Sequence, residues 1–151
     1  MKLDGFLKVP DITGPSVRDG HEDEIEIHGI EFEMVAPHDP NSLSRRGRVA
    51  LGVITFFKHY DKASPYLKQA LFQNKKLDEV VFSARRTIEE ATSDYLVITL
   101  TDASVVHYSM KPDQDEGEND LIEERIGFAY KTIKFVYDDK DEVEMDVHVG
   151  V

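Results

Sequence analysis

The stretch "EIEIHGIEFEM", residues 24–34, decides the fold, because its alternation of apolar and other residues changes phase in the middle. Apolar residues occupy odd positions before His28–Gly29 and even positions after it. A shift of one residue turns every later side chain to the opposite face of a strand, so the chain must bulge or bend there. Glycine tolerates such a bend.

A second stretch, "RIGFAYKTIKFVY" at residues 125–137, repeats the behaviour. Here the apolar positions are even before Lys131–Thr132 and odd after it. Long strands that change face halfway are what a barrel or an orthogonal sandwich needs at its corners. The two phase changes therefore predict a mainly β fold, a closed β-barrel of two sheets.

Further strands and loops are expected along the rest of the chain from the same alternation and from clusters of turn residues. We expect no second domain, so residues 1–151 form a single domain whose tail, 138–151, is a candidate extra strand. The other expected strands are 6–9, 49–57, 80–88, 95–110 and 143–149, and the main loops are 36–48, 89–94 and 110–120.

One short helix interrupts this pattern, and we expect it to flank the barrel and close one side. Ser64 is a good N-cap, Pro65 suits the first helical position, and Asn74 tolerates the left-handed exit. The helix is expected from Ser64 to Gln73. Its expected apolar face comprises Tyr66, Leu67, Ala70 and Leu71.

The composition limits the classes of partner. The net charge of −12 argues against nucleic acid and against anionic membrane surfaces. No apolar stretch approaches the ~20 residues that cross a bilayer, and the absence of cysteine removes disulfides and thiolate chemistry. The N-terminal "MKLDG" lacks the apolar segment of a signal peptide, so we expect no use of the general secretory route.

The sequence offers little that predicts catalysis. No two of its six histidines have the helical spacing of a metal site, and "HEDE" at 21–24 is interpreted as a solvated turn in preference to a cation site. Residues 14–20, "GPSVRDG", are also interpreted as a turn, and no nucleophile or phosphate-loop motif occurs. We therefore expect no catalytic residue, cofactor or metal site, and a protein that is not an enzyme.

The many expected strands and the lack of a recognisable catalytic or metal site favour a protein that assembles with copies of itself. Exposed strand edges must be paired or guarded, and a symmetric ring pairs them between neighbouring copies. Two alternatives remain open from the residues alone. The chain could act as a monomeric ligand- or peptide-binding β-barrel, or as a hydrolase whose site is assembled from distant residues.

Several stretches taken in order resemble the Hcp family, the haemolysin-coregulated proteins that form the inner tube of the bacterial type VI secretion system. The resemblance spans about residues 6–137 and is most specific between Phe57 and Leu67. The stretches are Phe6–Lys8 with Ile12, Gly14 and Ser16; His21 with Glu24–Ile27; Phe57–Lys58, Tyr60–Pro65 and Leu67; Leu100–Asp102; and Phe128–Tyr137.

This resemblance implies a barrel like that of phage tail-tube proteins, whose copies close into hexameric rings that stack into a tube. A contractile sheath surrounds such a tube, a VgrG-type spike tips it, and small secreted effectors are held in its lumen. The subunit is then cytoplasmic until assembly, and afterwards it is secreted through the type VI machine without a signal peptide.

The loop 36–48 is, by the same resemblance, the extension that reaches the next ring. Its candidate stacking residues are Ser44, Arg45, Arg46 and Arg48, which we expect to meet acidic residues such as those of the 113–120 loop. A mobile loop in isolated rings is the alternative for this segment.

Overall fold

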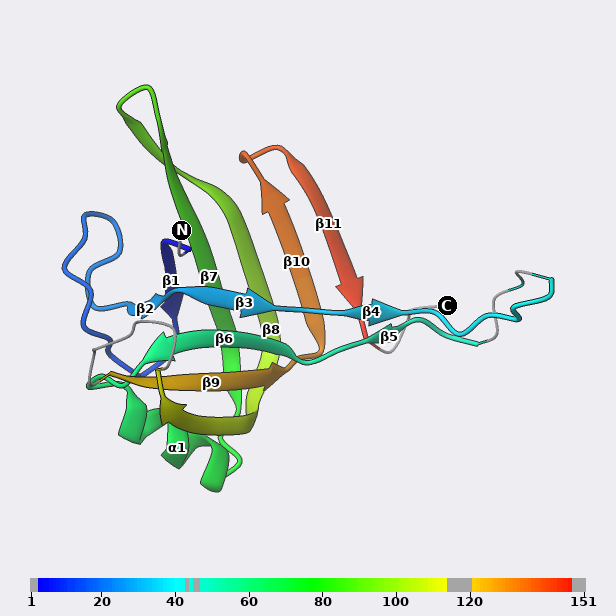
Figure 1. Ribbon diagram of the computed structural model, residues 1–151, viewed down its shortest axis with the longest axis horizontal. Helices are drawn as coiled ribbons and strands as arrows, with labels where there is room; N and C mark the ends of the chain where they lie inside the picture. Colours follow the sequence, from blue (N-terminus) through cyan, green and yellow to red (C-terminus); the bar gives the residue numbers. More distant parts are fainter. Residues whose placement is uncertain (1–2, 43, 45–46, 114–120, 148–151) are drawn as a thin grey trace.

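The computed structural model describes residues 3–42, 44, 47–113 and 121–147. The expected mainly β fold with one short helix is confirmed (Figure 1). The elements are β1 (Gly5–Lys8), β2 (Ile25–Ile27), β3 (Gly29–Glu31), β4 (Met34–Val35), β5 (Ala50–Leu51), β6 (Ile54–His59), α1 (Ser64–Phe72), β7 (Leu77–Ile88), β8 (Ala91–Pro112), β9 (Ile122–Ala129), β10 (Thr132–Tyr137) and β11 (Asp141–Asp146).

The strands form an antiparallel ladder that curls back on itself. Its path runs β2-β1-β7-β8-β9-β6-β3, and β10 and β11 extend it from the first half of β8. The two ends of the path, β2 and β3, are consecutive in the chain and are separated only by His28. The N–H of His28 donates to the carbonyl of Phe57 at 2.9 Å, so the path is joined at this corner by the backbone itself.

Both phase changes seen in the sequence fall at corners of the sheet. Before His28 the chain pairs with β1, and after it with β6. Before Lys131 the chain forms β9, which pairs with β6 and with the second half of β8. After Lys131 it forms β10, which pairs with the first half of β8. The strand β8 bends at the same corner: Asp102 has a φ of 51°, and Lys131 N–H lies 3.0 Å from the carbonyl of Thr101.

Three phenylalanines form the centre of the core between the sheet faces. Phe56 lies on β6, with ring centroids 5.1 Å from Phe82 of β7 and 5.7 Å from Phe128 of β9. All three side chains are buried, and Leu67 and Ala70 of α1 add to the same cluster. The helix therefore covers one side of the barrel, as the sequence predicted, and the interior is filled by side chains.

The N-cap prediction for Ser64 is wrong. Ala63 occupies the cap, and Ser64 is the first helical residue, because its hydroxyl is engaged by the side chains of Lys58 and Glu124. The predicted exit is confirmed at Asn74, whose φ is 52°. Its N–H donates to the carbonyl of Leu71, and the next N–H donates to the carbonyl of Ala70, a Schellman ending.

The helix buries a narrower face than the sequence predicted, and it ends at Phe72, one residue earlier than expected. Leu67 and Ala70 are buried, whereas the side chain of Tyr66 is 55% exposed. No helix among the described residues has the length and apolar character needed to cross a membrane.

The expected loop at 89–94 is shorter than predicted. The β7–β8 ladder continues to the pair Ile88–Ala91, which leaves only Glu89 and Glu90 in the turn. Both have positive φ, 50° and 67°, as a two-residue type I′ turn requires. The outer part of this hairpin, residues 86–93 and called here the β7–β8 ribbon, projects from the body (Figure 1).

Candidate assembly surfaces and their buried anchors

A buried ion pair joins the helix to the sheet. Lys58 on β6 and Glu124 on β9 face each other in the antiparallel register, and both side chains have no exposed surface. The Lys58 ammonium lies 2.6 Å from Glu124 Oε1, 3.0 Å from Asp61 Oδ1 and 3.0 Å from the hydroxyl of Ser64. The ammonium thus has charged and neutral acceptors from the strand, the turn and the first residue of α1.

The Glu124 carboxylate is satisfied at both oxygens. Ser64 donates to Oε1 at 2.6 Å, and the phenol of Tyr108 on β8 donates to Oε2. Burial alone would raise the pKa of Glu124, but the hydrogen bonds from Lys58, Ser64 and Tyr108 outweigh it and hold that pKa below its usual range. Burial and the bond to Glu124 raise the pKa of Tyr108. This cluster is therefore a closed structural anchor.

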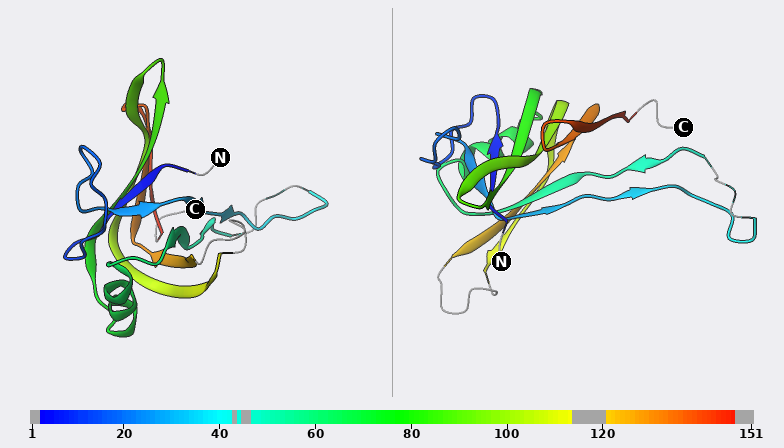
Figure 2. Two further views of the ribbon diagram at one scale, coloured as in Figure 1. Left: turned by 60° about the vertical axis from the view of Figure 1, so that its left-hand side comes forward. Right: turned by 90° about the horizontal axis from the view of Figure 1, so that it is seen from above.

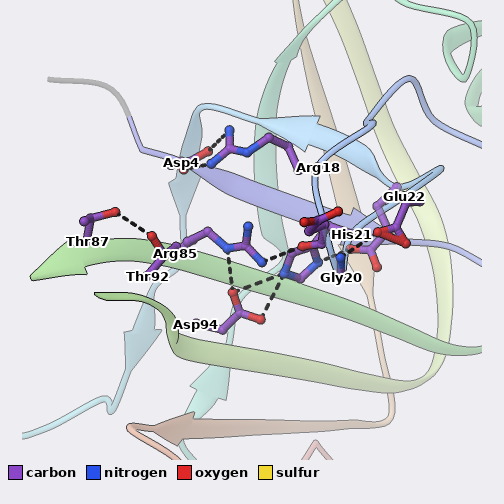
Figure 3. Close-up of polar contacts among 11 residues, drawn as sticks. Asp4, Arg18, Gly20, His21, Glu22, Arg85, Thr87, Thr92 and Asp94 are labelled. Carbon is purple, nitrogen blue, oxygen red and sulfur yellow. Dashed lines mark hydrogen bonds and ion pairs between the residues drawn. The ribbon is translucent and has the colours of Figure 1, made fainter. Parts of the chain in front are cut away.

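A second polar cluster surrounds His21, and it corrects the interpretation of residues 21–24 as a solvated turn (Figure 3). His21 is 5% exposed and stacks on Phe6 with ring centroids 4.4 Å apart. Its Nδ1 lies 2.8 Å from Glu24 Oε1, and its Nε2 lies 2.9 Å from Asp94 Oδ2. The loop before β2 is thereby attached to the base of the β7–β8 ribbon.

The described residues between β3 and β6, 34–42, 44 and 47–51, form an arm that projects away from the body (Figure 2). Its strands β4 and β5 form a separate two-stranded sheet. The arm is held at its base, where the Tyr130 phenol donates to the carbonyl of Gly52 at 2.6 Å and Gly52 N–H donates to Glu33 at 2.9 Å. Burial raises the pKa of Tyr130 to about 12, so this donor stays protonated across the physiological range.

Apolar side chains on and beside the arm are exposed. Met34 and Val35 of β4 are 45% and 48% exposed, and Val53 at the base is 44% exposed. A shallow cavity of about 220 Å³ is lined by Val35 and Val53 together with Phe32 and Ala50. An isolated two-stranded ribbon is at best marginally stable in water, so this arm presents a surface that favours a partner.

Two of the predicted stacking residues, Ser44 and Arg48, lie on the described part of the arm, between β4 and β5. Ser44 accepts a backbone hydrogen bond from Asp39 at 2.7 Å, and Arg48 precedes β5. Arg45 and Arg46 lie outside the described residues. Of the acidic residues expected opposite them, Asp113 is buried and contacts His59 at 2.6 Å, while 114–120 also lie outside the described residues.

The strand β11 forms a second exposed surface. Among the described residues it pairs with β10 alone, which leaves its other side as an edge. Val143 is 50% exposed, and Lys134 of β10 reaches Glu142 at 3.5 Å in an exposed ion pair. Acidic residues alternate along β11, and charged side chains are a common guard of strand edges.

A cleft of about 440 Å³ beside β1 and β2 is lined by two histidines, a residue type that often acts as a catalytic acid or base. The rings of His28 and His59 meet there at 4.5 Å, and His59 is paired with Asp113. Among the residues that line this cleft no serine, threonine or cysteine supplies a nucleophile. Within the described part of the chain, no three His, Cys, Asp or Glu side chains form a group that could hold a metal ion.

Comparison with known proteins agrees with this geometry. The structure superposes on Hcp1 from E. coli EAEC 042, studied as a double mutant, with a TM-score of 0.82 and 22% identity over 97% of this chain and 99% of that one. Hcp1 from Salmonella typhimurium gives a TM-score of 0.78 at 24% identity over 99% of this chain and 98% of that one. At such identities the likeness establishes the fold, a mainly β architecture with one short helix.

The sequence itself establishes the family. The family described as "Type VI secretion system effector, Hcp" matches residues 6–137. The "Major exported protein" of Pseudomonas aeruginosa is 30% identical over 132 residues, which cover 85% of this chain and 77% of that protein. The chain therefore belongs to the Hcp family of type VI secretion proteins, which are secreted, β-rich tube proteins.

The buried anchor was missed in the sequence, although a signal for it exists. Lys58 shares its phase with the inward-facing Ile54 and Phe56, and Glu124 shares its phase with Ile126 and Phe128. A charged residue of each sign at a core-facing position of two strands indicates a buried pair. The partner of His21 on β8 is 73 residues away, and no local pattern marks it.

We expect Lys58→Met to lower the free energy of unfolding by about 3–5 kcal/mol, because it leaves the Glu124 carboxylate buried without its cation. Urea denaturation followed by circular dichroism measures the change. The matched control Lys134→Met removes an exposed pair and should cost less than about 1 kcal/mol. Equal losses in the two variants would contradict the anchor role of Lys58.

The lowered pKa of Glu124 also gives a pH dependence. Because the folded value lies below the unfolded one, the ionised carboxylate stabilises the fold above pH 4.5 and loses that contribution as the pH falls through the folded value. Glu124→Gln should therefore be destabilised relative to the parent at neutral pH, and the difference should shrink in acid. Urea midpoints of both proteins from neutral to acidic pH test this, and a constant difference would refute it.

Proposed function

We propose that this protein is a structural subunit of the type VI inner tube and has no catalytic activity. In this proposal the whole chain, 1–151, acts as one tube domain, whose tail, 138–151, supplies β11. Six copies close into a ring, rings stack into a tube inside the contractile sheath, and a VgrG-type spike caps it. Sheath contraction expels the tube, which carries small effectors in its lumen.

The observation that carries the proposal is the arm. A two-stranded ribbon with Met34 and Val35 nearly half exposed is not a structure that a monomer favours. A neighbouring copy supplies the missing cover in a repeated, symmetric assembly. The edge of β11 is a second surface that pairing between copies would use.

The route of export in this proposal follows from membership of the family. The subunit stays in the cytoplasm until the tube assembles, and it then leaves through the type VI machine itself without a signal peptide. Its partners are accordingly other copies of itself, the sheath, the spike and the effectors, with no nucleic acid and no membrane among them.

The first test is the mass of the purified protein in solution. A single chain has a mass of 17.2 kDa, so a ring of six has a mass of about 103 kDa. We expect size-exclusion chromatography with light scattering to give the larger value and electron microscopy to show closed rings. A stable species of single-chain mass at high concentration would overturn the proposal in favour of a monomeric ligand- or peptide-binding barrel.

The second test concerns the stacking residues Ser44, Arg45, Arg46 and Arg48. We expect replacement of the three arginines by serine to weaken stacking of rings while leaving each ring intact. Exposed pairs contribute less than about 1 kcal/mol each, but a ring repeats every contact. Stack length by electron microscopy, compared between low and high salt, measures the effect.

The control for this test carries the same change in charge elsewhere. Lys8 on β1, Lys76 between α1 and β7, and Lys140 between β10 and β11 are exposed and belong neither to the arm nor to the 113–120 loop. Their replacement by serine should leave stack length close to that of the parent. If both triple variants stack as the parent does at every salt concentration, the assignment of the arginines fails.

A further inference from the structure

The β7–β8 ribbon has weak support from the rest of the sheet. The strand β1 pairs with β7 only up to Ala84, and β10 reaches β8 only as far as Leu96. A register shift between Ala84 and Arg85 marks the point where the ribbon leaves the sheet. Side chains at its base must therefore fix its direction.

His21 is one of these side chains (Figure 3). Its Nε2 lies 2.9 and 3.1 Å from the two oxygens of Asp94, which is paired across the hairpin with Arg85. Its Nδ1 lies 2.8 Å from Glu24, and its ring stacks on Phe6 of β1 with an interplanar angle of 4°. The imidazole thus joins three parts of the chain: the segment before β2, β1 and β8.

The proton count of this ring follows from its neighbours. A neutral imidazole has one N–H donor and one lone pair. At this site a lone pair on either nitrogen would face a carboxylate oxygen at hydrogen-bonding distance, which is repulsive. The contacts are therefore all attractive when both nitrogens of His21 carry protons, so that each donates to one carboxylate.

We propose that His21 is a doubly protonated clip that holds the β7–β8 ribbon against β1, and that loss of one of its protons releases the ribbon. Because a ring that has lost one proton would place a lone pair against a carboxylate, the clip makes the ribbon sensitive to pH. The clip is formed within a single chain and does not depend on the proposed ring or tube.

The surrounding charges determine the direction of the effect. Glu24 and Asp94 face the imidazole, and among the described residues the other cation that pairs with them is Arg85, whose Nε lies 3.3 Å from Asp94 Oδ1. Arg85 also donates to the backbone carbonyl of Asp19. The neighbouring Arg18 forms an ion pair with Asp4 at 2.9 Å. Deprotonated His21 therefore leaves excess negative charge, and the ribbon loosens as the pH rises.

A second clip on the other side of the ribbon supplies an internal reference. Arg86 contacts Asp138 at 3.1 Å and the phenol of Tyr137 at 3.4 Å, and its guanidinium lies 4.8 Å from the ring of Tyr95. A guanidinium keeps its charge throughout the accessible pH range. Its contribution to holding the ribbon is therefore independent of the protonation of His21.

Hydrogen exchange on the full-length protein tests the clip. Protection factors of amides 86–93, corrected for intrinsic exchange rates, are measured from about pH 5.5 to about pH 8.5. We expect protection to fall about ten- to a hundredfold as the pH rises, the range of one charge-assisted hydrogen bond. Core amides around Phe56 should change little.

The variants separate the two clips. His21→Gln should give low protection at every pH, whereas Arg86→Met should lower protection throughout but keep the slope with pH. If His21→Gln does not fold, Glu24→Gln replaces it, and the fall in protection should then move to lower pH. Unchanged protection in the parent across the range, or a slope that persists in His21→Gln, would overturn the proposal.

The protonation state is also accessible directly. Nitrogen-15 spectra of histidine-labelled protein near neutral pH should show both ring nitrogens of His21 protonated, with the residue assigned by its contact with Phe6. A neutral tautomer, with one protonated and one bare nitrogen, would contradict the clip even if the exchange data followed the expected trend.

Discussion

The buried pair of Lys58 and Glu124 is the interaction on which the arrangement of the helix and sheet depends. A buried charge that loses its partner is costly, so the elements that supply the partners must be in place together. These elements are β6, β9, β8 through Tyr108, and the first turn of α1 through Ser64. The same hydroxyl that would have capped the helix is used here, which explains why the cap lies at Ala63.

Much of the fold was predictable because side-chain phase is a local property of sequence. The shifts at His28 and Lys131 predicted the two corners, since a strand that changes face must also change neighbours. The length of the β7–β8 hairpin was not predictable in this way. Its polar residues resemble a loop, but the cross-strand pair of Arg85 and Asp94 and the turn at Glu89 and Glu90 extend the ladder.

The candidate surfaces were predictable only in part. The sequence showed 36–48 as a long loop, whereas the ribbon of β4 and β5 depends on pairing that composition does not reveal. The polar residues at 21–24 resemble a solvated turn, yet His21 is buried because Asp94 meets it from a distant strand. A local sequence pattern cannot predict buried polar contacts between segments that are distant in the sequence.

The length of β8 has a mechanical consequence. This strand of 22 residues pairs with β7 over 91–103 and also with β10 over 96–101, whereas its residues 104–112 pair with β9. Ladder hydrogen bonds in antiparallel sheets lie perpendicular to the strands. A pull along β8 therefore loads many of them in shear at once, whereas a pull across it peels them one after another. A load along β8 is therefore carried from the half that pairs with β7 and β10 to the half that pairs with β9.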